Sequence, residues 1–216
     1  NFITMPISNL DFHSSVYLWE ITETLEELLD IPVLTEEERI IVVSFRKENR
    51  KKEILASRAL LQHILPGAHI HYVNKNPQFT DMDKEISITH SGNKVMIQLR
   101  EKDELCGVDL QEISEKAVKV KSKFLHPSEV RLMEEHLWET SLLCNLFWSA
   151  KEAAFKAFAS ICEQEEVIEF KTQLIIKEID SKNLTLTGQF IEKNKRTAFT
   201  LGFSVQETFV ICWFEN

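Results

Sequence analysis

The sequence predicts an α+β protein in which helices pack on small, mostly antiparallel sheets. Short stretches of alternating apolar and polar residues, separated by turn residues, occur at 85–100 and 184–214 and are typical of antiparallel strands. Longer stretches with apolar residues at helical spacing occur at 48–65 and 140–160. Helices and strands therefore occur in both halves of the chain.

The order of these elements predicts the domain organisation. Each half has helices together with strands, so we expect two pseudo-symmetric lobes, residues 1–103 and 104–216. The charged run at 101–104 is the expected link between them. We find no internal sequence repeat, so the expected duplication rests on element order alone.

Composition excludes several classes of protein. The chain has 216 residues, 44% of them hydrophobic, which is enough for one large core or two small ones. It carries 25 basic and 34 acidic residues, formally −9, which argues against a nucleic-acid or anionic-membrane binder. Basic residues cluster locally at 46–58 and 116–123. Such clusters indicate either a specific anionic partner or a solvated helix face.

The cysteines and the apolar runs predict a cytoplasmic location. The four cysteines form no CxxC and lie among apolar residues, so we expect buried, reduced thiols rather than a zinc site or disulfides. The sequence shows no signal-peptide pattern. No apolar run approaches the ~18 residues of a membrane-spanning helix.

In the first half, no element is predicted for residues 1–15, and strands and helices follow. The predicted strands are Val16–Ile21, His69–Val73, Glu85–His90 and Lys94–Arg100, and the predicted helices are Glu23–Leu29, 36–45 and Glu48–Leu65. Thr35 and Glu38 have the spacing of a capping box, which begins the second helix. Turns are expected at 74–77 and 91–93, and the second of these closes a hairpin.

In the second half, one short strand precedes three helices and several strands. The predicted elements are a strand Leu105–Leu110 ending on Asp109, helices at Ser114–Leu125, 126–138 and 140–160, and strands Val167–Ile179, Leu184–Ile191 and two within Thr197–Phe214. Turn residues at 180–183 and 192–194 separate the last strands.

The helix at 140–160 carries one polar stripe on an otherwise apolar surface. Its members recur at spacings of three or four and are Asn145, Ser149, Glu152, Lys156 and Ser160. A carboxylate and an ammonium group on such a stripe need water, each other or a ligand. The stripe therefore predicts either an exposed Glu152–Lys156 pair or a binding site.

Asp109 and Gln111 lie two apart on one strand face, which makes them candidate metal ligands. An aspartate at the end of a buried strand is costly unless it is paired or bound to a metal. Together with Glu152 from a facing helix, Asp109 suits Mg²⁺, which prefers oxygen ligands and often takes one or two carboxylates. The alternative is an aspartate that caps a loop.

Two further patterns suggest anion binding. His90 ends a strand at a turn of Ser, Gly and Asn, whose backbone N–H groups can face an anion; the alternative is a histidine in an ordinary hairpin turn. Arg58 lies within an apolar helix stretch, and Arg50 lies eight positions earlier near the same face. Arginine suits phosphate, although an interhelical salt bridge is the alternative.

Together these motifs resemble the phosphopantetheinyl transferase superfamily. The matching segments occur in the family's order and spacing and are Thr89-His90-Ser91-Gly92, Gly107-Val108-Asp109-Leu110 and the helix stretch from Trp148 to Lys156. The likeness covers about residues 86–157 and is closest to the larger, monomeric, two-lobed type. The stretch Leu55–Leu61 resembles the family's arginine-bearing helix, and Lys123–Pro127 resembles the phenylalanine-containing segment after the metal strand.

The resemblance implies Mg²⁺-dependent transfer of 4′-phosphopantetheine from CoA to a serine of an acyl or peptidyl carrier protein. It further implies a cytoplasmic monomer serving fatty-acid or secondary-metabolite synthesis. Asp109 and Glu152 would hold Mg²⁺, and Glu152 would accept the serine proton. The CoA-binding residues would be Lys156 and Lys151 at the pyrophosphate, and His90, Thr89, Arg58 and Arg50 toward the 3′-phosphate.

Two residues depart from the family pattern. Gln111 stands where many relatives have an acidic residue, so either its carbonyl oxygen or water would complete the metal site. Asn76 stands where the family has a lysine, which weakens one nucleotide contact. These departures leave a catalytically weak paralogue that binds CoA or a carrier protein as the alternative. A metal-dependent nucleotide hydrolase is a more distant one.

Overall fold

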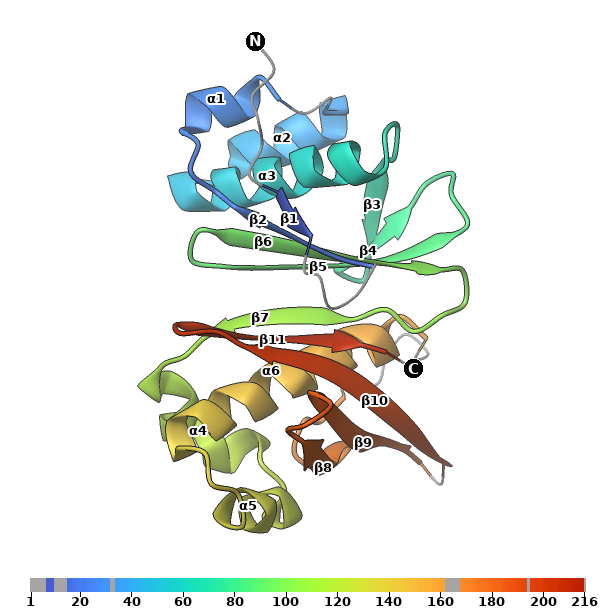
Figure 1. Cartoon of the computed structure of the whole chain (residues 1–216). Coiled ribbons are helices and arrows are strands. Elements are labelled where there is room, and N and C mark those ends of the chain that lie inside the picture. The colour runs from blue at the N-terminus through green and yellow to red at the C-terminus, as the bar shows by residue number, and fades with distance from the viewer. Residues whose placement is uncertain (1–6, 10–14, 32–33, 162–167, 194, 216) are drawn as a thin grey trace.

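The computed structural model describes residues 7–9, 15–31, 34–161, 168–193 and 195–215 (Figure 1). Its helices are α1 Leu25–Leu29, α2 Glu36–Ser44, α3 Glu48–Ile64, α4 Glu115–Phe124, α5 Pro127–Glu134 and α6 Thr140–Ala159. Its strands are β1 Ile7–Asn9, β2 Val16–Glu20, β3 Ile70–Val73, β4 Asn76–Phe79, β5 Lys84–Ser91, β6 Lys94–Glu101, β7 Val108–Glu112, β8 Leu174–Asp180, β9 Thr185–Glu192, β10 Lys195–Val205 and β11 Phe209–Phe214. All described strand pairs are antiparallel, which confirms the α+β prediction.

The first half of the chain forms helices on a sheet, which we call the N-terminal lobe. Its main sheet has the order β1-β2-β6-β5, and β3 and β4 form a separate hairpin. The helices α1 to α3 cover one face of the main sheet (Figure 1). Trp19, Leu60 and Ile97 are buried in the core between sheet and helices. Burial of such apolar surface is the main force that holds this lobe together.

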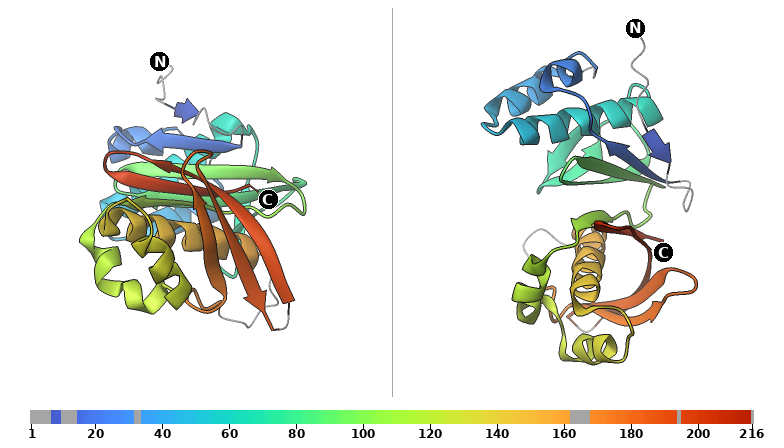
Figure 2. Two further views of the ribbon diagram at one scale, coloured as in Figure 1. Left: turned by 60° about the horizontal axis from the view of Figure 1, so that its bottom comes forward. Right: turned by 60° about the vertical axis from the view of Figure 1, so that its left-hand side comes forward.

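The second half forms a curved sheet around one long helix, which we call the C-terminal lobe. The sheet order is β7-β11-β10-β9-β8. Figure 2 shows α6 lying in the concave face of this sheet. Phe147 and Phe158 of α6 are fully buried there, the latter 4.3 Å from the ring centre of Phe190. The helix is therefore the centre of this lobe's core.

The two lobes contact each other through both apolar and polar groups. Val16 and Met96 of the N-terminal sheet share a small buried cluster with Val108 and Trp213 of the C-terminal sheet. Beside it, the buried Gln98 side chain donates to the Phe214 carbonyl oxygen at 2.7 Å and accepts from the Gly107 N–H at 3.0 Å. The predicted boundary at residues 103 and 104 falls between β6 and β7.

Most predicted elements are present, including the Thr35–Glu38 capping box and the β5–β6 hairpin. Within the described residues, no helix is long and apolar enough to cross a membrane. Residues 162–167 lie outside the described part of the chain, so the predicted start of a strand at Val167 does too.

Four sequence predictions are wrong in detail. No element was predicted at β1, and Asn76-Pro77 was assigned to a turn although both residues belong to β4. Proline is tolerated there because β4 is paired on one side only, to β3. The helix beginning after His126 ends at Glu134 rather than about Trp138, and Asp109 lies inside β7 rather than at a strand end.

Candidate active site

The polar stripe of α6 lies along β7. Ser149 Oγ donates to the Asp109 carbonyl oxygen at 3.4 Å, and Lys156 Nζ donates to the Val108 carbonyl oxygen at 2.9 Å. A Cβ atom at Gly107 would lie 2.0 Å from the Ala153 carbonyl oxygen. Glycine at this position therefore allows the strand to approach the helix backbone, and the stripe becomes the contact surface between them.

Asp109 is held by one side chain from each lobe. Its Oδ1 atom accepts a hydrogen bond from Lys156 Nζ at 2.9 Å and from Thr89 Oγ1 at 3.2 Å. The carboxylate is 10% exposed and the lysine side chain 24% exposed, so the pair lies at the edge of solvent. The exposed Glu152–Lys156 pair that the sequence left open is not formed; the lysine pairs with Asp109 instead.

Glu152 is the second carboxylate of the site. Burial, and then the negative charge of Asp109, raise its pKa to about 7, while Lys156 opposes the shift. Among the described residues, none donates a hydrogen bond to the Glu152 carboxylate, and none donates to Oδ2 of Asp109. Two neighbouring carboxylates thus keep oxygen atoms that lack a cationic or donor partner.

This donor set fits a magnesium ion. Mg²⁺ takes oxygen ligands and commonly uses one or two carboxylates, with water and substrate phosphates completing its coordination. Over the described ranges, no group of three or more His, Cys, Asp or Glu side chains is placed to hold a metal ion. Gln111 lies two residues after Asp109 on β7, where its amide nitrogen donates to the Glu112 carbonyl oxygen at 3.0 Å. Its role as a ligand stays a prediction.

A second group of ionisable side chains joins α3 to the end of β5. Glu53 Oε2 lies 2.9 Å from Arg50 Nη1 and 3.1 Å from His90 Nδ1, and Arg50 also contacts the other ring nitrogen of His90. Burial is the main cause that lowers the pKa of His90; Arg50 and Lys156 lower it further, whereas Glu53 and Asp109 raise it. The group is therefore close enough to the carboxylate site to be coupled to it electrostatically.

The other predicted anion-binding residues lie apart from these groups. Arg58 is buried and pairs with Glu38 of α2 at 2.5 Å, which is the interhelical salt bridge given as the alternative. Lys151 is fully buried and pairs with Glu129 of α5 at 2.8 Å. Its ammonium group also donates to the carbonyl oxygens of Phe124 and Phe170, both at 2.8 Å. Direct contacts of Arg58 and Lys151 with CoA stay predictions.

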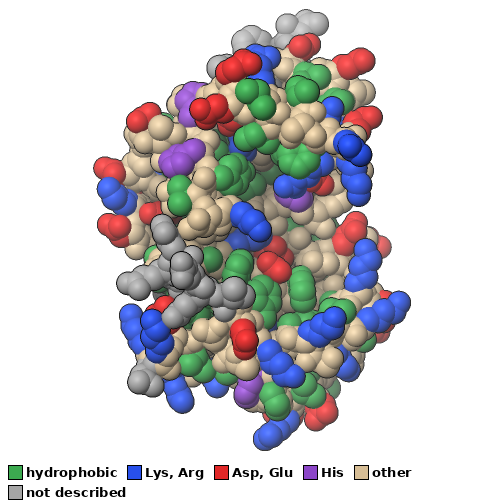
Figure 3. All heavy atoms as spheres, turned by 180° about the vertical axis from the view of Figure 1, so that it is seen from behind, with side chains coloured by type: hydrophobic (Ala, Val, Ile, Leu, Met, Phe, Trp, Pro, Cys, Tyr) green, Lys and Arg blue, Asp and Glu red, His purple; other side chains and the backbone are tan. Residues whose placement is uncertain are grey.

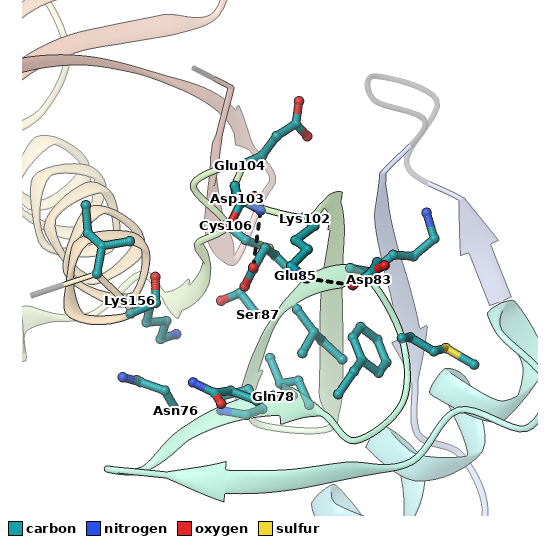
Figure 4. A pocket seen from close by; sticks show the side chains of 18 of the residues that line it. Asn76, Gln78, Asp83, Glu85, Ser87, Lys102, Asp103, Glu104, Cys106 and Lys156 are labelled. Atoms are coloured by element: carbon teal, nitrogen blue, oxygen red, sulfur yellow. Dashed lines mark hydrogen bonds and ion pairs between the residues drawn. The ribbon is translucent and has the colours of Figure 1, made fainter.

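A pocket of about 660 Å³ opens between the lobes beside Lys156. Its lining includes residues of β4, β5 and the end of α6. Figure 4 shows Lys156 of α6 near Asn76 of β4, and Glu85 and Ser87 on β5. Asn76 Nδ2 donates to the Ala159 carbonyl oxygen at 3.4 Å, which ties the β3–β4 hairpin to α6. Figure 3 shows the hollow between the lobes, where acidic, basic and apolar side chains meet.

Sequence reasoning missed Glu53 and Glu129. Glu53 lies within a run of charged residues, so its contact with His90, 37 positions away in sequence, had no local signal. Glu129 did carry a signal, because it stands three residues after His126 and completes a capping box there. That spacing indicates a helix start but not an ion pair with α6.

Comparison with known proteins identifies a family for the second half of the chain. Residues 105–213, half of the chain, match a model of the 4′-phosphopantetheinyl transferase superfamily. No curated protein matches the chain. The matched region contains Asp109, Glu152 and Lys156. The chain belongs to the 4′-phosphopantetheinyl transferase superfamily, whose members transfer phosphopantetheine and use CoA as a substrate.

Proposed function

We propose that this protein transfers the 4′-phosphopantetheine group of CoA to a serine of an acyl or peptidyl carrier protein in a Mg²⁺-dependent reaction. The observation that carries the proposal is the meeting of Asp109, Glu152 and Lys156 beside the pocket between the lobes. Two carboxylates with free oxygen atoms and one lysine are the groups that a pyrophosphate substrate with its metal requires.

The chemistry is a phosphoryl transfer. The carrier serine oxygen forms a bond to the pantetheine-side phosphorus of CoA, and the bond from that phosphorus to the bridging oxygen breaks, so adenosine 3′,5′-bisphosphate leaves. Mg²⁺, held by Asp109 and Glu152, would supply charge neutralisation at the pyrophosphate when bound. The serine proton passes to Glu152, either directly or through water.

Lys156 stabilises the charge that develops on the leaving phosphate. A lysine ammonium group has three N–H donors. Two of them go to Val108 and Asp109, and within the described part of the chain the third has no acceptor. It is therefore available to a phosphate oxygen without disturbing the other contacts. Preorganised charge of this kind accounts for much of the catalysis in phosphoryl transfer.

CoA binding follows from the same arrangement. The nucleotide part of CoA lies in the pocket between β4, β5 and α6, with its pyrophosphate toward Lys156. Its 3′-phosphate lies toward His90 and Arg50, which retain about a third of their side-chain surface, 37% and 38%. Arg58 contributes only if its pair with Glu38 opens.

Intact-mass spectrometry of an apo-carrier protein tests the proposal. Incubation with the enzyme, CoA and Mg²⁺ should add one phosphopantetheine to the serine, and chelation of Mg²⁺ should prevent the addition. A panel of acyl and peptidyl carriers should be used because the site does not specify one. Tight CoA binding without any mass increase across the panel would favour the weak paralogue, and release of adenosine bisphosphate without carrier would favour the hydrolase.

A further inference from the structure

We propose that Thr89 is a positioning residue that holds the Asp109 carboxylate ready for its metal ion from across the lobe interface. This inference rests on the proposed function, because it assumes that Asp109 ligates Mg²⁺. It gives Thr89 a role at the metal site, whereas the sequence had placed this residue on the CoA side.

Successive side chains of β5 point to opposite faces of the sheet and contact different parts of the protein. Ile86 and Ile88 pack with the core of the N-terminal lobe, and His90 continues on that side toward α3. Ser87 and Thr89 point to the opposite face, toward β7. Two adjacent residues of one strand, Thr89 and His90, therefore serve different sites because successive side chains point to opposite faces.

Ser87 and Thr89 make different kinds of contact with β7. Ser87 Oγ accepts from the backbone N–H of Val108 at 3.0 Å, which joins the two strands. Thr89 Oγ1 instead donates to the carboxylate oxygen Oδ1 of Asp109 at 3.2 Å. The Ser87 contact binds the backbone of β7, whereas the Thr89 contact binds the side chain of Asp109.

The hydroxyl of Thr89 fixes the plane of the carboxylate. Asp109 Oδ1 accepts from both Thr89 Oγ1 and, at 2.9 Å, Lys156 Nζ, so two donors hold this oxygen atom. Thr89 and Asp109 are only 5% and 7% exposed, which leaves little room for water to replace a lost hydroxyl. Oδ2 accepts from neither donor and is the oxygen atom that would meet the metal ion.

Partners of metal-ligating carboxylates typically change metal affinity or activity about 10–100-fold when they are removed. We therefore expect Thr89→Val to weaken metal binding by that factor. Thr89→Ser keeps the hydroxyl and should restore affinity to near the wild-type value. Gln98→Met is the matched control, because it removes hydrogen bonds between the same two lobes at a residue that touches neither the carboxylate nor the CoA pocket.

The test is direct Mn²⁺ binding to the CoA-bound protein, followed by electron paramagnetic resonance. Mn²⁺ accepts the same oxygen ligands as Mg²⁺ and reports free and bound ion separately. CoA affinity in the absence of metal is measured alongside by calorimetry, because the sequence places Thr89 on the CoA side; a loss of CoA affinity as large as the loss of Mn²⁺ affinity would overturn the inference. Thermal unfolding identifies variants whose stability, rather than their carboxylate geometry, has changed.

The expected pattern is weaker Mn²⁺ binding in Thr89→Val alone, with lower thermal stability in Gln98→Met alone. Unchanged Mn²⁺ affinity in Thr89→Val would overturn the inference while leaving the metal site intact. Equal losses of Mn²⁺ affinity in both variants would overturn it too, because the effect would then come from the lobe contact in general. A wild-type protein that binds Mn²⁺ no better than Asp109→Ala would instead remove the proposed metal site, and the inference with it.

Discussion

Two lysine–carboxylate pairs on α6 differ in how completely their groups are satisfied. Lys151 and Glu129 are both 0% exposed and lie 2.8 Å apart, and the remaining donors of Lys151 go to two backbone carbonyl oxygens. Glu129 also accepts from the backbone N–H groups of His126 and Ile176. Lys156 and Asp109 lie 2.9 Å apart but remain partly exposed.

The difference separates structure from function along one helix. Burial raises the pKa of Glu129 and lowers that of Lys151, and the pair persists because the two charges and their hydrogen bonds oppose both shifts. The pair connects α6 to α5, to the end of α4 and to Phe170. At Lys156 and Asp109, by contrast, one N–H donor and one carboxylate oxygen lack a partner among the described residues. The incomplete pair is the one that can bind a substrate.

The largest expected effect comes from removing the carboxylate of the Lys156–Asp109 pair. Asp109→Ala should lower the transfer rate by roughly 10⁴-fold, about 5.5 kcal/mol, because the metal and Lys156 lose their common partner. The fold should persist, since the pair lies at the edge of solvent and Lys156 can turn toward water. Rates are measured by carrier mass increase, and circular dichroism checks the fold.

A matched control for this variant is Asp180→Ala, at the last residue of β8. That carboxylate also accepts a hydrogen bond, from Asn183, but lies at the partly exposed end of β8, next to a turn of the C-terminal lobe. It should leave turnover unchanged. Wild-type turnover in Asp109→Ala would remove the assigned role of Asp109 and with it the contrast between the two pairs.

Breaking the buried Lys151–Glu129 pair should lower the stability of the fold rather than the rate of the reaction. Lys151→Met leaves Glu129 buried without its cation and should lower the free energy of unfolding by about 3–5 kcal/mol. Urea unfolding measures the loss. The double variant Lys151→Met with Glu129→Leu should recover much of it, because no unpaired charge remains. If Lys151→Met unfolds like the wild type but loses CoA affinity, Lys151 belongs to the CoA site after all.

The sequence was sufficient for the parts of this site that depend on local spacing. The α6 stripe and the Gly107–Asp109 segment follow from the periods of helix and strand, and the structure contains both. Their convergence was predicted from the family resemblance. The structure supplies the physical reason, which is the close approach of β7 and α6 at Gly107. Outside the site, the spacing of Thr35 and Glu38 predicted the start of α2 in the same way.

Local spacing could not predict which partner each charged side chain takes. Lys151 and Lys156 lie in the same motif, yet Lys151 is paired with the buried Glu129 of α5, whereas Lys156 pairs with Asp109 and lines the pocket. Arg58 likewise pairs with Glu38 because α2 packs on α3. Phe124, which follows the basic cluster at 116–123 and lies in the segment that resembles the family's phenylalanine-containing one, is buried in the core of the C-terminal lobe. Each of these outcomes depends on packing between elements.

The two arginines of α3 differ in the same way, because Arg50 is partly exposed whereas Arg58 is buried and paired with Glu38. Dephospho-CoA should bind more weakly than CoA by about 1.5–3 kcal/mol, the contribution of a charge-assisted contact to the 3′-phosphate. Arg50→Ala should remove most of this difference, because Arg50 is partly exposed beside His90, whereas Arg58 is closed by Glu38. Calorimetry with both ligands measures it, and Arg39→Ala on the exposed face of α2 is the control. Equal affinities of the wild type for both ligands would place the 3′-phosphate elsewhere.

The smallest expected effect concerns the carrier protein, which we expect to dock on α4. Lys116, Lys119, Lys121 and Lys123 are exposed on this helix, and Val118 and Val120 are partly buried. The resemblance implies that carriers are acidic, so the overall charge of −9 opposes association and a local basic surface must favour it. The buried Lys151 fixes this surface relative to Glu152, because it binds the Phe124 carbonyl oxygen at the end of α4.

Reversal of two lysines tests this surface. Lys119→Glu with Lys123→Glu should raise the KM for the carrier several-fold at low salt, with little change in CoA binding, because exposed charges mainly set the rate and salt dependence of association. The effect should shrink near physiological ionic strength, where the Debye length is about 8 Å. A reversal of Lys182 and Lys195, which lie on distant turns and edges of the same lobe, controls for net charge. Equal KM changes in the two double variants would mean that net charge, and not α4, governs docking; no change in either would move the docking surface elsewhere.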